Sequence, residues 1–446
     1  MKKKGISILL LLIFFFAFQL ITQAKDADCL DPVDITGEAA ADYPEETSTK
    51  RKKRKKTRTV QLKRFYLRVT DGAEDSVPVP LPNTRYTIRL VTKEQEVFLH
   101  EGVTNNQGEI KDVALRKIPL EGASLKIGYI LGNDQRGYVQ KYNKKPYSFV
   151  FTLRLGSDNT INYSNHQVLF GKEKQEETFF YNFQAARIND YFDQAVQAQA
   201  NAVKQARKLL PDTAKFTIKP ININFEQGKY LDKSNAFSRN GHDNRAIPDI
   251  VMGDRSDKNF ETKKLMHNIM HEWTHWTMYT TFAMPGGEYD SHYGVNSDPK
   301  ISYKEGWALF AGEFFAAPES LAERDTLVQE DDHQGVNRLF GKSTNLTVQQ
   351  VLYDLLDTGS TDEAFHISER YLDEERSEQA MHQVNFGILY TLMLESEATT
   401  LQEFLTYLED KYIVTASDKE KFTEVLKING LARDGSFSKA NPENQE

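Results

Sequence analysis

Between residues 60 and 155, apolar and polar residues alternate in short segments, which is the pattern of half-buried strands. The segments read VQLKRFYLRV, TRYTIRLV, EVFLHEGV, ASLKIGYI and YSFVFTLRL. Turn-forming clusters separate them, such as Asp71-Gly72 and the NNQG sequence at 105–108. Their length and spacing predict an all-β sandwich over residues 60–155.

Beyond residue 182 the apolar positions follow a helical period instead. Ile188, Phe192, Val196 and Val203 recur at this period within 183–210, and Pro211 helps to end the helix. Further helices are predicted over residues 348–356, 377–394, 401–412 and 419–426. Two β-branched runs, at 216–225 and 246–252, predict a small sheet. We expect residues 246–251 to form its edge, where an extended peptide can pair.

The chain is therefore predicted to be α+β, with an N-terminal β-sandwich module followed by a mostly helical domain. We expect the domain boundaries to be a signal peptide at 1–24, a disordered linker with a basic run at 25–59, the β module at 60–155, a bridge at 156–182, the metal-binding domain at 183–431 and a polar tail at 432–446.

The chemistry is concentrated in residues 266–282, MHNIMHEWTHWTMYTTF, which contain the pattern HExxH at His271, Glu272 and His275. Residues four apart lie on one face of a helix, so both imidazoles can bind one metal ion. The adjacent carboxylate can take a proton from a metal-bound water. The uncharged neighbours, such as Trp273 and Trp276, predict that this helix is buried. The alternative is a buried helix with two hydrogen-bonded histidines.

A catalytic zinc site needs a third protein ligand and one open position. Glu305 is the candidate, at the start of a predicted apolar helix over residues 303–316 and thirty residues after His275. A carboxylate in a first helical turn can also be a favourable N-terminal charge. Other possible ligands are Glu288, Asp290, His292 and Glu313. The expected cofactor is one catalytic Zn²⁺.

HEWTH, followed by a glutamate in the sequence EGWA, resembles the gluzincin metallopeptidases, which include thermolysin and fungalysin. Residues 234–254 are similar to the substrate-binding segment of that family, and the resemblance implies that Asn235 and Ala236 bind the extended substrate. Residues 380–394 resemble the helix that carries the transition-state histidine, here His382. The resemblance implies a zincin-type domain.

One position departs from the thermolysin pattern. An Asp that orients a zinc ligand from outside the metal's coordination sphere is replaced by Leu309, so another group, such as Glu313, would have to orient the histidine ring. Tyr293 and Tyr390 are alternatives to His382 for stabilising the oxyanion. The glycine- and tyrosine-containing loop at 284–302 is either a lid or a plain connector.

These features predict an exported zinc metallopeptidase that hydrolyses peptide bonds through a zinc-activated water with Glu272 as general base. The substrate would be a peptide or protein, with no nucleic acid partner, and the pattern weakly favours an endopeptidase. The alternatives are a surface-binding protein with a degenerate zinc domain, and a zinc amidase acting on non-peptide or cell-wall amides. The oligomeric state is left open.

The N-terminus carries three lysines, an apolar run at 6–21 and a small-x-small site ending at Ala24, which is typical of a secretory signal peptide. The alternative is an uncleaved membrane anchor. We expect cleavage after Ala24 and a secreted, periplasmic or cell-surface location. The basic run at 50–56 is either a solvated linker, a contact for an anionic surface or a site for a trypsin-like protease.

The single cysteine, Cys29, excludes a disulfide within the chain. The formal net charge of −8 indicates an acidic protein. Residues 80–110 resemble transthyretin-like or carboxypeptidase-regulatory-like modules, and no catalytic constellation is present in this part. We therefore expect the β module to act in folding, spacing or adhesion, with a surface or a protein as its possible partner.

Overall fold

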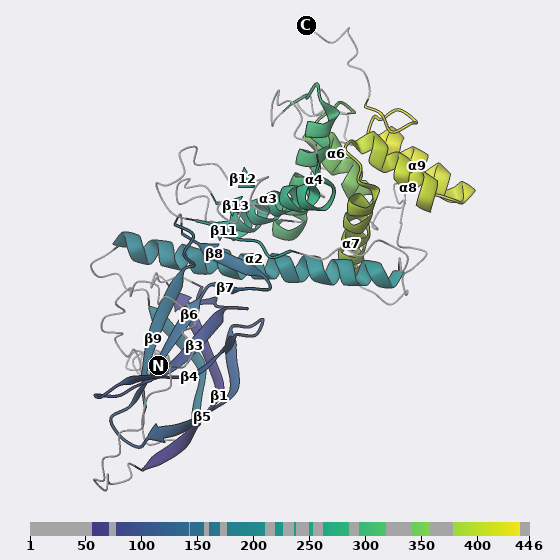
Figure 1. The fold of residues 1–446 in the computed structure, drawn as a ribbon. Helices are drawn as coiled ribbons and strands as arrows, with labels where there is room; N and C mark the ends of the chain where they lie inside the picture. The colour runs from purple at the N-terminus through teal and green to yellow at the C-terminus, as the bar shows by residue number, and fades with distance from the viewer. Residues whose placement is uncertain are drawn as a thin grey trace, which may run out of the picture.

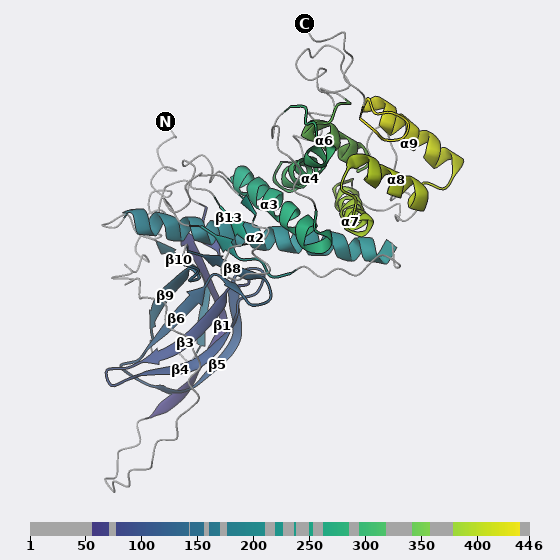
Figure 2. The same ribbon diagram turned by 45° about the horizontal axis from the view of Figure 1, so that its top comes forward.

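The computed structural model describes the chain between residues 56 and 437 in twelve segments, and it confirms an α+β fold (Figures 1 and 2). The described residues are 56–70, 77–141, 143–155, 160–169, 176–209, 219–225, 236–237, 249–252, 262–284, 294–317, 341–356 and 378–437. The segments predicted to be a signal peptide and most of a linker, and the end of the predicted tail, lie outside them. No described helix is both long enough and apolar enough to span a membrane.

The N-terminal part contains two four-stranded sheets. The first is antiparallel throughout, in the order β4-β3-β6-β9. Its strands are β3 (Arg85–Val91), β4 (Glu96–Val103), β6 (Ser124–Ile130) and β9 (Ser148–Arg154). Burial alternates strictly along β3, where Tyr86, Ile88 and Leu90 are buried. This is the period-2 pattern from which these strands were predicted.

The second sheet centres on β1 (Thr57–Thr70), which pairs with β5 (Glu109–Pro119), β2 (Val79–Pro80) and β10 (Thr160–Leu169). Strand β10 runs parallel to β1, whereas β5 and β2 are antiparallel to it. The segment expected to be a bridge, 156–182, therefore contains a strand of this sheet and the first residues of the next helix. Both sheets bury their apolar faces in one continuous core.

A third, five-stranded sheet joins the N-terminal part to the helical C-terminal part. Its order is β12-β13-β11-β8-β7, with β7 (Gly132–Asn133), β8 (Gly137–Gln140), β11 (Ile223–Asn224), β12 (Ala236–Phe237) and β13 (Ile250–Val251). Strands β8 and β11 pair in parallel across the boundary expected at residue 155. Gly137, at φ +99°, permits this contact, because a Cβ there would overlap the backbone of Ile221.

The same sheet corrects the expected edge strand. Strand β13, which lies within the predicted 246–251 segment, has β11 on one side and β12 on the other. Among the described strands, the terminal one is therefore β12, which contains Ala236. The β-branched residues at 246–252 predicted a strand, but the pattern did not indicate which short strand lies at the end of the sheet.

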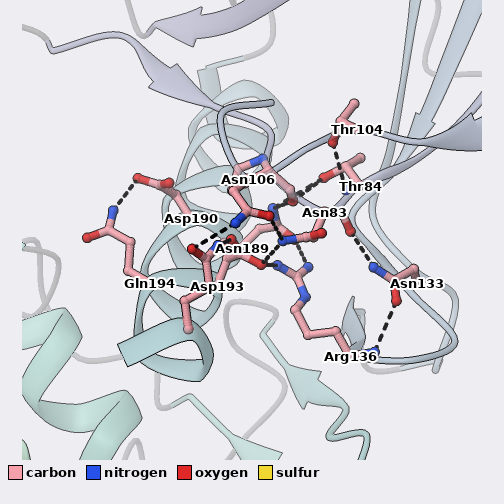
Figure 3. A network of polar contacts seen from close by, with 12 residues as sticks. Asn83, Thr84, Thr104, Asn106, Asn133, Arg136, Asn189, Asp190, Asp193 and Gln194 are labelled. Carbon is pink, nitrogen blue, oxygen red and sulfur yellow. Dashed lines mark hydrogen bonds and ion pairs between the residues drawn. The ribbon is translucent and has the colours of Figure 1, made fainter. Parts of the chain in front are cut away.

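Helix α2 (Glu176–Leu209) runs between the N-terminal sheets and the helices that follow it in the chain (Figure 1). A buried polar network fastens it to the sheets (Figure 3). Arg136 Nη1 donates to Asp193 Oδ1 at 2.9 Å and to the Asn189 carbonyl at 3.3 Å, and Asn83 Nδ2 donates to the same Asp193 oxygen at 2.7 Å. Asn189 Nδ2 also donates to the Pro82 carbonyl at 3.2 Å. These contacts join α2 to the loop between β2 and β3 and to the turn between β7 and β8 of the five-stranded sheet.

Helix α3 (Thr262–Phe282) buries most of its apolar residues in the same core as the sheets, and Met278 near its end reaches a second apolar core. The helices around that second core are α4 (Pro299–Ala316), α6 (Asn345–Asp354), α7 (Glu378–Ser396), α8 (Leu401–Tyr412) and α9 (Ala416–Ile428). Helices α8 and α9 each begin with a capping box, at Thr400 with Glu403 and at Thr415 with Asp418. Such a cap satisfies two of the free N–H groups of the first turn, which defines where each helix begins.

Candidate metal centre

Helix α3 carries His271, Glu272 and His275, as the spacing predicted. Its apolar positions are buried, with Trp273 at 1% and Trp276 at 2% exposure. The Trp273 ring packs edge-on against Phe192 of α2 at 5.8 Å. The helix is therefore fixed from below by α2, and its histidine-bearing face is turned towards α4.

Helix α4 carries the third residue, Glu305. The helix begins at Pro299, and the Asp298 side chain caps it by accepting from the Lys300 N–H at 3.0 Å. The helix thus begins four residues before the start predicted at residue 303, and Glu305 lies in its second turn and not in its first. This position excludes the alternative in which Glu305 is only a first-turn charge. Its side chain is 4% exposed, so it is directed into the protein.

Two glycines of α4 allow this helix to approach its neighbours closely. A Cβ on Gly306 would overlap the Val348 side chain and lie 2.9 Å from the Asn345 carbonyl of α6. A Cβ on Gly312 would lie 2.8 Å from His267 Nδ1 and 3.0 Å from the His267 carbonyl of α3. At both positions, an added Cβ would be closer to its neighbours than normal van der Waals contact allows. Glycine at these two positions therefore sets the spacing that brings Glu305 to the histidines.

The donor atoms of the three residues form a compact triangle. His271 Nε2 and His275 Nε2 are 3.2 Å apart, while Glu305 Oε2 is 3.1 Å from His275 Nε2 and 3.5 Å from His271 Nε2. Tetrahedral zinc, with bonds of about 2.0–2.1 Å to nitrogen and oxygen, requires donors separated by about 3.3–3.4 Å. The three distances bracket that value. Three donors of this kind, all within 4.8 Å of one another, can hold a metal ion.

The donor triangle is more exposed to solvent on the side of His271 than elsewhere. The side chains of His275 and Glu305 are 5% and 4% exposed, whereas that of His271 is 20% exposed. Glu272 is 7% exposed. A buried carboxylate beside two imidazoles is expensive to desolvate unless a cation accompanies it. The donor set and its burial thus fit a bound cation with access for a small ligand near His271.

The other possible ligands are not part of the triangle. Glu313 is buried and accepts a hydrogen bond from Gln349 Nε2 at 2.7 Å. Glu288, Asp290 and His292 lie outside the described residues.

The group that orients His271 is not found among the described residues. His271 Nδ1 is buried and has no hydrogen-bond partner there. The His267 ring stacks beside the His271 ring, with a centroid distance of 5.9 Å and an interplanar angle of 24°. Leu309 is apolar, as the sequence showed, and Glu313 hydrogen-bonds to α6. Among the described residues, the stacked His267 ring is therefore a contact that helps to orient the His271 ring.

The remaining predicted site residues are placed as follows. Ala236 lies in β12, which packs beside α3. The backbone of His382 lies near the start of α7, and its side chain is outside the described part. Tyr390 is fully buried in α7, stacked on Phe386 at 5.6 Å, and burial raises its pKa to about 12. The structure thus places Tyr390 in the core. Asn235 and Tyr293 lie outside the described residues.

Sequence reasoning missed the roles of Gly306, Gly312 and His267. Glycine within a helical pattern costs stability and signals a packing requirement, so two glycines in an apolar helix were the available signal. His267 precedes His271 by four residues, which is the spacing of stacked side chains on a helix face. Both signals are present in the sequence, but neither indicates which helix packs against these positions.

Comparison with known proteins gives little further information. No protein-family model matches the sequence, and no curated protein matches it. A solved structure with a weak likeness is a 9R-lipoxygenase from Cyanothece PCC8801, which is 12% identical over 86% of this chain and 68% of the lipoxygenase chain. Its TM-score is 0.16, so no inference about fold or function is drawn from it.

Proposed function

We propose that this protein is an exported zinc metallopeptidase. The observation that supports the proposal is the donor triangle of His271, His275 and Glu305, together with the carboxylate of Glu272 beside it. Two histidines and one glutamate form a donor set used for catalytic zinc. The two four-stranded sheets are proposed to be a sandwich module, and the helical part to be a zincin-type domain.

The chemistry divides between the ion and the protein. When bound, zinc lowers the pKa of a coordinated water and polarises a carbonyl oxygen. Glu272 follows His271 directly in the helix, where it can accept a proton and return it to the leaving amine. Glu305 contributes the negative charge that balances the cation. The greater exposure of His271 is consistent with substrate approaching from that side.

An extended peptide is the proposed substrate because of strand β12. This strand is the last in the five-stranded sheet, it packs beside α3, and it contains Ala236. A terminal strand offers free backbone groups to a peptide in an extended conformation. Its position next to the metal-binding helix would direct the scissile bond of such a peptide towards the donor triangle.

Metal analysis combined with a peptide-library digest tests the proposal. We expect about one zinc per chain and peptide cleavage that stops with a chelator. Glu272→Gln should retain zinc and lose at least a hundredfold in kcat, because the general base is removed while all three ligands remain. Glu409→Gln, on the exposed surface of α8, is the matched control and should keep wild-type activity. Full turnover by Glu272→Gln would refute the mechanism.

The two alternatives give different results in the same assay. A zinc-loaded protein that cleaves no peptide in the library would favour a binding protein with a degenerate zinc domain. Cleavage of purified cell-wall fragments, without cleavage of denatured protein, would favour an amidase. The backbone edge beside α3 favours the peptidase over both.

A further inference from the structure

Charge is divided unevenly along this chain. Residues 56–155 contain 17 Lys and Arg against 10 Asp and Glu, a formal net charge of +7. Residues 156–446 contain 29 against 46, a formal net charge of −17. The seven residues at 50–56, KRKKRKK, lead directly into β1. Such a division favours contact between the basic part and an anionic partner, with the acidic part turned away.

Much of the positive charge lies on β1 and β5, which pair with each other. Their apolar side chains, including Val60, Leu62 and Val113, are buried in the core. The exposed cations of these strands therefore lie on the solvent side of the sheet. We call them the β1–β5 basic face, which consists of Lys63, Arg64, Lys111, Arg116 and Lys117.

The basic face has little acidic charge to neutralise it. Within β1 and β5, Glu109 is 7% exposed and binds Arg64 at 2.5 Å. Asp112 is the one exposed acid of these two strands. Among the described residues, no ion pair involves the other four members of the face. Their charge is therefore available to a partner.

We propose that the β1–β5 basic face docks onto an anionic phospholipid bilayer. The strand register places Lys111 opposite Arg64, and it places Arg116 and Lys117 between the partners of Val60 and Arg58, so the five charges form one patch about 20 Å long. That distribution suits a continuous charged surface better than a single small anion. The choice of lipid rather than nucleic acid rests on the proposed export, which brings the protein to a membrane surface.

Docking in this way would orient the molecule. Strands β1 and β5 lie on the opposite side of α2 from α3 and α4 (Figure 2). An anionic bilayer would attract the basic face and repel the acidic remainder. The acidic part, which carries the donor triangle, would therefore be repelled by the bilayer and left accessible to soluble or surface-attached substrates.

Sedimentation with vesicles tests this proposal. The full chain is mixed with vesicles of phosphatidylcholine containing 30% phosphatidylglycerol, and with pure phosphatidylcholine vesicles, at about 0.1 M and 0.5 M salt. The test variant replaces Lys63, Lys111, Arg116 and Lys117 with Gln. The control variant removes the same number of charges from exposed positions on α8 and α9, by replacing Lys411, Lys419, Lys421 and Lys427 with Gln.

Each Lys or Arg near an anionic surface strengthens binding about fivefold, so the test variant should bind the anionic vesicles at least a hundredfold more weakly. The control should remain within about threefold of wild type, and binding should be lost at 0.5 M salt. Circular dichroism and cleavage of a soluble peptide should not change in the test variant, which separates this proposal from the peptidase proposal. Equal binding by the two variants, binding that persists at high salt, or binding to duplex DNA but not to vesicles would overturn it.

Discussion

Removal of one partner from the ion pair between Arg136 and Asp193 should strongly destabilise the junction between the sheets and α2. Arg136 is 5% and Asp193 2% exposed, and their atoms are 2.9 Å apart. Burial lowers the pKa of the Arg136 guanidinium, and the nearby Asp193 carboxylate opposes that shift. The pair is thus desolvated, and removing one partner leaves the other charge buried.

Asp193→Ala is the perturbation to test. Loss of one partner from a buried pair costs about 3–5 kcal/mol, and Asn83 Nδ2 loses its acceptor as well. Arg136→Met should cost somewhat less, because Asp193 keeps other donors. The double variant Arg136→Met/Asp193→Ala removes both charges and should cost less than the sum of the single variants, with an interaction energy of about 2–3 kcal/mol.

Urea unfolding followed by circular dichroism measures these free energies in a double-mutant cycle. Gln194→Ala, on an exposed position of α2, is a control that should change stability by less than about 0.5 kcal/mol. Single-variant effects that simply add, to within about 0.5 kcal/mol, would show that the pair does not hold α2 against the sheets.

Two further predictions concern the metal-binding helices and pH. Gly306→Ala should lower zinc affinity at least tenfold and the unfolding free energy by about 1–3 kcal/mol, because α4 must move away from α6. The double variant Gly306→Ala/Val348→Ala should recover part of both losses, as measured by zinc titration and urea unfolding. If the second substitution recovers neither, the packing argument is wrong. Burial raises the pKa of Asp190 from its ordinary 3.8 to about 6. The contribution of this group to the stability of the folded state is therefore present below about pH 4 and is lost as the pH rises through 6. Asp190→Asn should therefore raise the unfolding free energy by up to about 3 kcal/mol at pH 8 and by little at pH 4. An equal effect of the substitution at both pH values would contradict this prediction.

The sequence predicted local features better than contacts between distant segments. The HExxH helix, its buried neighbours and most of the strands follow from the spacing of apolar residues, because one face of each element must be buried. Glu305 was found as a possible ligand because zinc requires a third donor. The helix start at Pro299 was missed, although the sequence Asp298-Pro299 is a typical helix beginning.

Pairing between distant strands was less predictable. Strand β10 pairs in parallel with β1, and β8 pairs with β11, and neither pair has a local signal. The polar network of Arg136 also escaped detection, since asparagines and an arginine in turns are typical of solvated loops. Their burial depends on α2 crossing those turns, which a linear pattern does not show.

The pairing of β8 with β11 has a consequence for biogenesis. Val139 lies opposite Ile223, so β8 has no partner on that side until more than eighty further residues have emerged. As the chain emerges, β8 would wait with one edge unpaired, which is a site for association with other chains. Slower emergence of the middle of the chain would lengthen that interval, and a holding chaperone would be most useful at this stage.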